Sequence, residues 1–512
     1  MASRWERAAR GYALAPVRTV ALVAGGVGLA LAAGSIAAAG PWQGGQRTAE
    51  ARQVKPQVKV VVRVKPRPVP PPVWIAPQDV LQSTDVTPVT SVPPVAAGGT
   101  PSSPQAPLPT AAGLAAALAP ALASDALGKV TASVVDAATG RTLYSSGAST
   151  PQTPASTNKI ATSVAALSLL GPAHRFTTTV VSPAPGRIVL VGGGDPTLTA
   201  AATRGADPQA SLATLADRTA TALKSTGTTK VRLGYDISLF SGPAVHPIGI
   251  NDNIALVQAL TVDEGRLDPH STENAPRYAD PAATAASTFA ALLRKRGITV
   301  TGYPTPTTPP KAAKAAAANA AAKAAPLAEV SSQPLGEIIE RMLTESDNDV
   351  AETLGHQVAI AAGDPATFTG GATAVRQELA KLGIRLGGTR LVDSSGLSGL
   401  DVIPANVLTQ LLVLASSAAH PELRSVVSGL PVAGFTGTLD NRYDSGSSTA
   451  GLGVVRAKTG SLSTVNTLAG LVVDRDGRLL VFAFMSNGSG DALSARTALD
   501  RLAGRVAVCG CR

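Results

Sequence analysis

The alternation of apolar and polar side chains predicts that a globular fold begins near residue 111. Residues 113–127 are rich in leucine and alanine, which predicts a helix. Residues 129–147 alternate apolar and polar positions on both sides of the turn "AATG", which predicts a β-hairpin. Two further strands are predicted at 175–181 and 187–194.

The segment "PASTNKIATSVAAL" at 154–167 has the spacing of a helix that is buried on one face. Helical patterns return in the last third of the chain, and strands follow them. The helices are expected at 335–363, 370–384, 404–416 and near 491–506, and the strands at 453–460 and 467–487 with Asp476-Gly477 as a hairpin turn.

Two low-complexity stretches separate these patterned regions. Residues 41–110 contain 15 of the 39 prolines, so we expect an extended, semi-rigid tether that cannot bury a core. The alanine-rich tract at 309–330 favours helix but has no apolar stripe that would hold it to a core. We therefore expect an exposed or disordered segment there and a boundary near residue 325.

Residues 19–39 form an uncharged run that is long enough, at about 31 Å as a helix, to cross a bilayer core. Four arginines and one glutamate precede it, which keeps the N-terminus cytoplasmic and exports the chain after Gly40. "AAAG" at 37–40 also offers a signal-peptide cleavage site. We expect an extracytoplasmic protein that is anchored by one N-terminal helix, or secreted if cleavage occurs near Gly40. The anchor is favoured because the run exceeds a usual signal core.

The charge distribution argues against a nucleic-acid partner. The formal net charge is +10, but residues 1–70 alone carry 11 Lys and Arg against two Glu. The globular part is therefore nearly neutral, without the basic surface that nucleic acid requires.

Cysteine and histidine usage excludes other classes of chemistry. Cys509 and Cys511 are the only cysteines, so a cysteine nucleophile within the fold is excluded. Their spacing makes a mutual bridge strained at best, and we expect a frayed C-terminal tail. The five histidines are scattered and form no zinc motif, so we expect no metal and no cofactor.

Ser156 and Lys159 stand three residues apart at the start of the predicted helix. A lysine on the same helical face can take the proton of a serine hydroxyl if its pKa is lowered by burial or by another cation. The helix N-terminus also offers N–H groups to a developing oxyanion. Alone, the pair favours the simpler interpretation of a serine cap beside a solvated lysine.

Two later motifs favour the chemical interpretation. Ser346-Asp347-Asn348 places a hydroxyl and an amide between two helical segments. Lys458-Thr459-Gly460 lies on a predicted strand, where the lysine and threonine can hold a substrate carboxylate and the glycine permits a close approach. S-x-x-K, S-x-N and K-T-G in this order are the motifs of penicillin-recognising serine enzymes.

With these motifs, residues 125–505 resemble the D-alanyl-D-alanine carboxypeptidase/endopeptidase family, the class C low-molecular-mass penicillin-binding proteins. The resemblance extends to "LVGGGDPTLT", "DSSGLS" and "AKTGSLSTVNTLAGLVV". It implies an α+β, penicillin-binding/β-lactamase-like transpeptidase fold, with a five-stranded antiparallel sheet, a helical cluster and a large insertion between the first two motifs. We expect the catalytic domain in two pieces at 111–175 and 326–512, around an inserted region at 176–325. The N-terminal segment 1–40 and the tether 41–110 depart from the family and are expected from hydropathy and composition.

The resemblance also implies a role for each motif residue. Ser156 is the acylated nucleophile and Lys159 its base, Ser346 and Asn348 relay protons and position the substrate amide, and Lys458 and Thr459 bind the terminal carboxylate, with Gly460 beside them. The backbone N–H groups of Ser156 and Ser461 form the oxyanion hole. The implied activity is hydrolysis of D-alanyl-D-alanine bonds in peptidoglycan stem peptides, with β-lactam antibiotics as covalent inhibitors.

Two other functions remain compatible with the motifs. A β-lactamase needs a base and a water for fast deacylation, and the sequence does not locate them. A non-catalytic wall-binding protein needs no intact Ser156, Lys159, Asn348 or Lys458, yet all four are present. The motifs do not distinguish removal of a terminal D-alanine from cleavage of cross-links.

Overall fold

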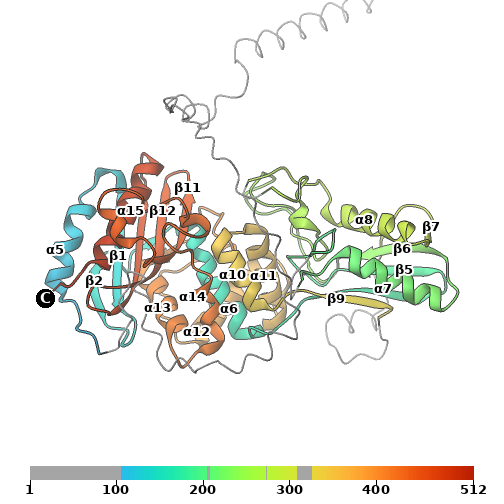
Figure 1. Ribbon diagram of the computed structural model, residues 1–512, viewed down its shortest axis with the longest axis horizontal. Coiled ribbons are helices and arrows are strands. Elements are labelled where there is room, and N and C mark those ends of the chain that lie inside the picture. The colour runs from blue at the N-terminus through green and yellow to red at the C-terminus, as the bar shows by residue number, and fades with distance from the viewer. Residues whose placement is uncertain (1–104, 204–207, 272–273, 308–325, 512) are drawn as a thin grey trace, which may run out of the picture. The chain divides into compact units, whose positions relative to one another are not determined.

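The computed structural model describes residues 105–203, 208–271, 274–307 and 326–511 (Figure 1). The predicted membrane segment, nearly all of the tether and most of the alanine-rich tract lie outside the described residues. Among the residues described, none of the helices combines the length and the apolar character needed to span a bilayer.

The two pieces expected to form the catalytic domain, 111–175 and 326–511 of the described residues, are called the catalytic part below. A five-stranded antiparallel sheet forms its centre, with the strand order β11-β12-β13-β1-β2. Its strands are β1 (Lys129–Asp136), β2 (Thr142–Ser146), β11 (Arg456–Leu462), β12 (Val465–Val473) and β13 (Leu479–Asn487). The two predicted hairpins form β1–β2 and β12–β13. They join because β1 pairs with β13, with Lys129 opposite Asn487. The predicted antiparallel sheet is confirmed.

Each face of this sheet buries its own core because successive strand residues point to opposite sides. Phe482 and Phe484 of β13 pack in the core beneath α5 (Ala111–Leu122) and α15 (Ala492–Ala507). Val481 and Met485 belong to the core on the other face, where α13 (Ala405–Ser416) covers the sheet. Each such side chain contributes about 1.5–3 kcal/mol through burial. The period-two pattern therefore fixes the register of β13.

The helical cluster lies on the α13 side of the sheet (Figure 1). Its helices are α6 (Lys159–Leu170), α10 (Leu335–Glu345), α11 (Asn348–Ala362), α12 (Phe368–Lys381) and α14 (Arg424–Ser428). A short pairing of β3 (Pro151–Gln152) with β10 (Ile403–Pro404) lies at its edge. The helical region predicted at 335–363 is two helices, since Ser346 has a left-handed conformation at the end of α10. Asp347 then caps α11 by accepting from Val350 N.

The inserted region, together with the strand that follows its expected end at residue 325, builds a second sheet with its own core. Strands β4 (Thr177–Ala184), β5 (Arg187–Val191), β6 (Lys230–Asp236), β7 (Thr299–Val300), β8 (Thr305–Pro306) and β9 (Ala328–Ser331) form this mixed sheet. Helices α7 (Leu212–Ser225) and α8 (Pro281–Lys295) share its buried core. Because β9 pairs with β4, the chain re-enters the catalytic part directly after the sheet closes.

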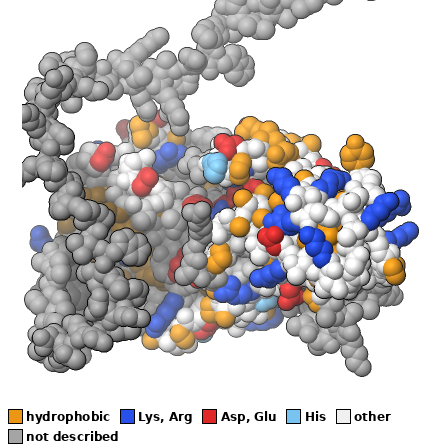
Figure 2. All heavy atoms as spheres, turned by 45° about the vertical axis from the view of Figure 1, so that its right-hand side comes forward, with side chains coloured by type: hydrophobic (Ala, Val, Ile, Leu, Met, Phe, Trp, Pro, Cys, Tyr) orange, Lys and Arg blue, Asp and Glu red, His pale blue; other side chains and the backbone are white. Residues whose placement is uncertain are grey.

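The surface of the inserted region comes forward in Figure 2, which shows Lys and Arg side chains among polar and apolar groups. Exposed basic residues of this region include Arg187, Lys224, Lys230, Arg232 and Lys295. Lys224 and Lys295 lie in the last turns of α7 and α8, where a cation compensates the helix dipole. We assign no function to this face.

The prediction of a frayed C-terminal tail is wrong. Cys509 is 2% exposed and packs in the core beneath α5 and α15. The backbone carbonyl of Cys511 accepts a hydrogen bond from Thr110 N at 2.7 Å, and the structure joins Cys509 to Cys511 by a disulfide. Sequence spacing cannot reveal this arrangement, because the tail is held by packing against α5, which lies far away in the sequence.

Candidate active site

The turn that precedes α6 carries Ser156 and is fastened by two hydroxyl groups. Thr157 Oγ1 and Thr467 Oγ1 both donate to the carbonyl oxygen of Pro154 at 2.7 Å. Ala155 has a φ of 48°, a left-handed conformation that costs a non-glycine residue about 1–2 kcal/mol. Such strain persists where the surroundings over-determine the backbone, which is common at functional sites.

Two glycines allow the chain to pack closely around this turn. A Cβ on Gly460 would lie 2.6 Å from the carbonyl oxygen of Pro154 and against Thr467. A Cβ on Gly396 would collide with the carbonyl oxygen of Ala155. The expected role of Gly460 in close approach therefore has a definite partner, the backbone that carries Ser156.

Ser156 is half-buried, and its hydroxyl accepts a hydrogen bond from Lys159 Nζ at 3.0 Å. Neither the 3₁₀ turn Ala155–Asn158 nor α6 receives a side-chain cap. The alternative interpretation of Ser156 as a helix cap is therefore wrong. The serine oxygen faces a fully buried amine instead.

Lys159 is 0% exposed and donates to two further oxygens. These are Asn348 Oδ1 at 2.7 Å and the backbone carbonyl of Ser395 at 2.9 Å. Burial lowers the pKa of Lys159 to about 8, although nearby carboxylates, Asp393 and Glu352 foremost, oppose this shift. At pH 7 about a tenth of Lys159 is therefore uncharged, far more than of an ordinary lysine, and this fraction can act as a general base.

Lys458 lies on β11 and is also 0% exposed. Its ammonium donates to Ser346 Oγ and to the carbonyl oxygen of Thr459, both at 2.8 Å. Burial, and then the positive charge of Lys159, hold the pKa of Lys458 well below its usual range. Of the two causes that the sequence offered for a lowered pKa of Lys159, burial or another cation, burial is the largest.

The remaining predicted residues line the same place. Thr459 Oγ1 shares a 2.8 Å hydrogen bond with Thr438 Oγ1, which fixes its side chain. Ser461 follows Gly460 on β11 and is exposed. The three motifs are therefore joined directly: Ser156 through Lys159 to Asn348, and Ser346 to Lys458.

The "DSSGLS" loop at 393–398 supplies part of the site that sequence reasoning left without a role. Besides the Ser395 carbonyl that faces Lys159, the carbonyl of Ser394 accepts from Thr162 Oγ1 at 2.6 Å. Glu352 of α11 holds this turn by accepting from the N–H groups of Ser394 and Ser395 at 3.0 and 2.7 Å. The signal was present in the quoted motif, but a backbone acceptor has no residue-type signature.

The inserted region also reaches the second motif. Asn348 Nδ2 donates to the carbonyl oxygen of Asn253 at 3.2 Å, which leaves Asn348 Oδ1 to face Lys159. Asp349, the next residue, accepts from Ala255 N at 2.8 Å and pairs with Arg277 Nη2 at 2.8 Å. The amide that meets the lysine is thus oriented from outside the catalytic part.

A second ionic cluster ties the inserted region to α10. Arg341 pairs with Glu264 and lies 3.4 Å from Asp347, while Arg266 Nε pairs with Glu264 at 2.9 Å. Burial, and then the charge of Asp347, raise the pKa of Glu264 to about 8. Glu264, Asp347 and Asp349 lie close enough to hold a metal ion. Because arginines and backbone N–H groups already bind their oxygens, we assign no metal there.

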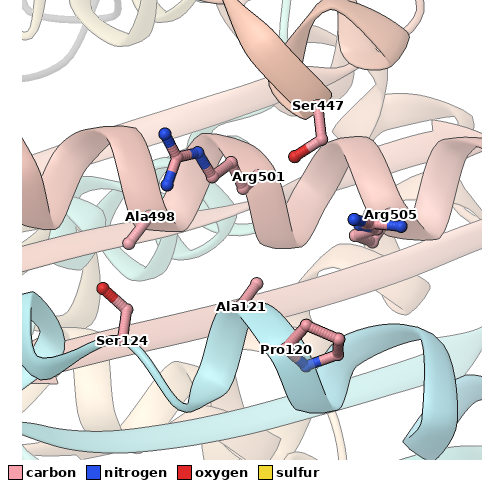
Figure 3. Close-up of a pocket in the computed structure, with 7 residues that line it drawn as sticks. All are labelled: Pro120, Ala121, Ser124, Ser447, Ala498, Arg501 and Arg505. Carbon is pink, nitrogen blue, oxygen red and sulfur yellow. The ribbon is translucent and has the colours of Figure 1, made fainter.

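A cavity of about 320 Å³ lies apart from all of these residues, between α5 and α15 (Figure 3). It is lined by Pro120, Ala121, Ser124, Ser447, Ala498, Arg501 and Arg505. None of the predicted site residues lines it. The predicted site residues lie instead where α6, α11 and β11 meet, and this cavity is separate from them.

The fold is that of the penicillin-binding serine enzymes. Among solved structures, penicillin binding protein 4 (dacB) from Haemophilus influenzae matches with a TM-score of 0.59 and 24% identity, covering 78% of this chain and 98% of that one. The predicted α+β fold with an antiparallel five-stranded sheet is thereby confirmed.

The sequence matches the D-Ala-D-Ala carboxypeptidase 3 (S13) family over residues 114–278 and 268–507. It is 40% identical over 418 residues to Carboxypeptidase DacB of Mycolicibacterium smegmatis, covering 79% of this chain and 86% of that protein. It is 38% identical over 428 residues to Carboxypeptidase Rv3627c of Mycobacterium tuberculosis, covering 82% and 89%. The chain belongs to this carboxypeptidase family and is a peptidase, as the motifs indicated.

Proposed function

We propose that the chain is a serine-type carboxypeptidase that removes the terminal D-alanine of peptidoglycan stem peptides, with Ser156 as its nucleophile. Lys159 acts as the base, Ser346 and Asn348 transfer protons and position the substrate amide, and Lys458 and Thr459 hold the terminal carboxylate. The N–H groups of Ser156 and Ser461 receive the oxyanion. A relative that is 30% identical over 433 residues is named D-alanyl-D-alanine carboxypeptidase, which supports this substrate.

The reaction follows from the order of contacts. Lys159 takes the proton of Ser156 Oγ while the oxygen attacks the carbonyl carbon of the penultimate D-alanine. The tetrahedral oxyanion collapses, the peptide bond breaks, and the terminal D-alanine leaves as an amine after receiving a proton. The proton passes through Ser346, which lies at the leaving-group side beside Lys458. Water then hydrolyses the acyl-enzyme with Lys159 again as base.

The buried Lys458 suits the recognition of a carboxylate. Its low pKa reflects an ammonium that lacks a counter-charge in a dry site. A substrate carboxylate supplies that charge and raises the pKa of Lys458, so binding and protonation are coupled. The same site can accept the carboxylate of a penicillin, which we propose acylates Ser156.

The 3.0 Å contact between Ser156 Oγ and the buried Nζ of Lys159 carries this proposal. The test is incubation of the protein with a fluorescent penicillin, followed by peptide mass mapping of the adduct. We expect label on Ser156 and none in Ser156→Ala, with a loss of peptidase activity on the order of 10⁴-fold. Label that persists unchanged in Ser156→Ala would overturn the proposal.

The products and the stability of the adduct separate the neighbouring functions. Release of D-alanine from monomeric stem peptides supports the carboxypeptidase, and cleavage of cross-linked muropeptides adds endopeptidase activity. Rapid turnover of the penicillin adduct would instead indicate a β-lactamase. A failure of Ser156 to react with either substrate would indicate a wall-binding protein.

We also propose that the enzyme works outside the cytoplasm, on a tether, with its catalytic domain in the two pieces 111–175 and 326–512 around the inserted region 176–325. The uncharged run at 19–39 and the arginines before it support a retained membrane anchor. Fractionation of cells that express the full chain tests this proposal. Recovery of a shortened protein in the medium, cut near Gly40, would show that the segment is a signal peptide.

A further inference from the structure

His246 of the inserted region lies in the interior of the catalytic site, although no motif includes it. Its side chain is 0% exposed, and Nε2 lies 3.3 Å from Asp393 Oδ2 and 3.5 Å from Glu352 Oε1. Ile248 N lies 3.3 Å from Nδ1, and Nε2 is the ring nitrogen that faces the two carboxylates. The ring also packs edge-on against Phe368 of α12, with centroids 5.0 Å apart.

These two carboxylates hold the loop that faces Lys159. Glu352 accepts from the N–H groups of Ser394 and Ser395, and Asp393 accepts from Gly396 and Ser398 at 2.7 Å each. The Ser395 carbonyl then accepts from Lys159 Nζ. His246 is therefore linked to Lys159 through the two carboxylates and the backbone of Ser395.

His246 is the cation that balances the negative charges of Asp393 and Glu352. Burial alone would lower the pKa of His246, but Asp393 and Glu352 outweigh it and raise that pKa to about 9. Burial and the charge of Asp393 raise the pKa of Asp401 to about 9, so Asp401 is neutral at pH 7. Burial lowers the pKa of the neighbouring His356, which is therefore also neutral.

The electrostatic consequence falls on the catalytic lysine. Asp393 and Glu352 are the two groups that most strongly oppose the lowered pKa of Lys159. An imidazolium wedged against both carboxylates offsets their field. Without it, two buried negative charges would stabilise the charged form of Lys159.

We infer that His246 is a positioning residue for the Lys159 base: it compensates Glu352 and Asp393 and so increases the fraction of the lysine that is uncharged and able to accept the serine proton near neutral pH. This inference rests on the proposed function. It gives the inserted region a part in catalysis that acts through α11 and the 393–398 loop.

The three side chains could in principle hold a metal ion instead, since their ligand atoms lie within 4.8 Å of one another. The carboxylate oxygens, however, are already bound by four backbone N–H groups. We therefore expect the acylation rate of the full-length protein to be unchanged after dialysis against a chelator. A loss that zinc restores would overturn the charge-balance inference in favour of a metal site.

The decisive test is the pH dependence of acylation by a fluorescent penicillin, measured between pH 6 and pH 9.5 on the full chain. His246→Gln removes the positive charge, so the acid limb of the profile should move up by about one pH unit, which lowers the rate at pH 7 about tenfold. Glu352→Gln removes a negative charge, so the limb should move down by a similar amount. The double variant should return towards the wild-type midpoint.

Opposite shifts are the signature that a purely structural role would not produce. His270→Gln is the matched control, because His270 is an exposed histidine of the same inserted region. An equal fall in rate at every pH, without a change of midpoint, would overturn the inference. If His246→Gln does not fold, the smaller variant His246→Asn, which also removes the positive charge, is measured in its place and should show the same upward shift. Wild-type protein that is not acylated at Ser156 would refute the proposed function, whereas normal wild-type acylation with unshifted variants would refute only this inference.

Discussion

The catalytic part and the inserted region contribute to one site by different means. In the proposed function, the catalytic part provides the reactive side chains at motif positions, such as Ser156, Lys159 and Lys458. The inserted region provides a backbone carbonyl from Asn253, an ion-pair partner in Arg277 and a buried imidazole in His246. The reacting groups thus lie on one part, while groups that fix their orientation and charge lie on both. Variants of the two parts should differ accordingly.

The largest expected effect within this comparison belongs to the catalytic part. Lys458→Ala removes the predicted carboxylate partner and leaves Ser346 without its 2.8 Å donor. We expect a loss of about 10²- to 10³-fold in kcat/KM for peptide substrates, because a buried charge contact is removed. Steady-state kinetics measure it.

Lys381→Ala is the control for this variant, since Lys381 is an exposed lysine on α12 that pairs with Glu378 at the surface. It should leave the kinetics unchanged. Equal effects of the two substitutions would contradict the assignment of Lys458.

The wild-type pH profile is expected to show the next largest effect. The pKa of Lys159 lies at about 8, below its ordinary value, so the uncharged base is lost as the pH falls through 8. Acylation should therefore rise about tenfold per unit between pH 6 and pH 8 and then level off. Stopped-flow measurements with a fluorescent penicillin test this, and a flat profile across that range would contradict Lys159 as the base.

A smaller effect is expected when an ion pair between the inserted region and α11, beside the second motif, is removed. Arg277→Gln breaks the ion pair with Asp349, in which the arginine side chain is 6% exposed and the aspartate side chain 10%. We expect the free energy of unfolding to fall by about 2–3 kcal/mol, because one partner of a buried ion pair is removed. We also expect kcat to fall about tenfold, because Asp349 then no longer fixes the position of the adjacent Asn348. Denaturant titration and kinetics on the same preparation measure both.

The matched variant for Arg277 lies in the same region. Arg296→Gln breaks an ion pair with Asp217, which is 65% exposed. Exposed pairs contribute about 0–1 kcal/mol, so stability should change by that amount or less and kcat should not change. A comparable fall in kcat would show that the inserted region acts through its general stability rather than through Arg277.

The same contrast explains how much of the site could be predicted from the sequence. Ser156, Asn348 and Lys458 are found by residue type and spacing, because nucleophile, amide and cation have fixed chemical requirements. The strands and helices around them follow from periodicity, as the β12–β13 hairpin shows.

The rest could not be predicted for physical reasons. The carbonyls of Asn253 and Ser395 are backbone groups that every residue possesses, so no residue type marks them. His246 looks like any isolated histidine, because its two carboxylate partners lie more than 100 residues away in the sequence. The order of the C-terminal tail cannot be predicted for the same reason, since it depends on packing against α5, which is distant in the sequence.

The pairing of β1 with β13 has a consequence for how the protein is made. Lys129 and Asn487 are opposite one another, so the sheet closes only when almost the whole chain is available. Until then β1 has an unpaired edge, and contacts this distant in sequence form slowly. A partly synthesised or partly exported chain therefore has no complete active site. With export as proposed above, activity begins only after β13 has crossed the membrane, so the enzyme is inactive during its own export.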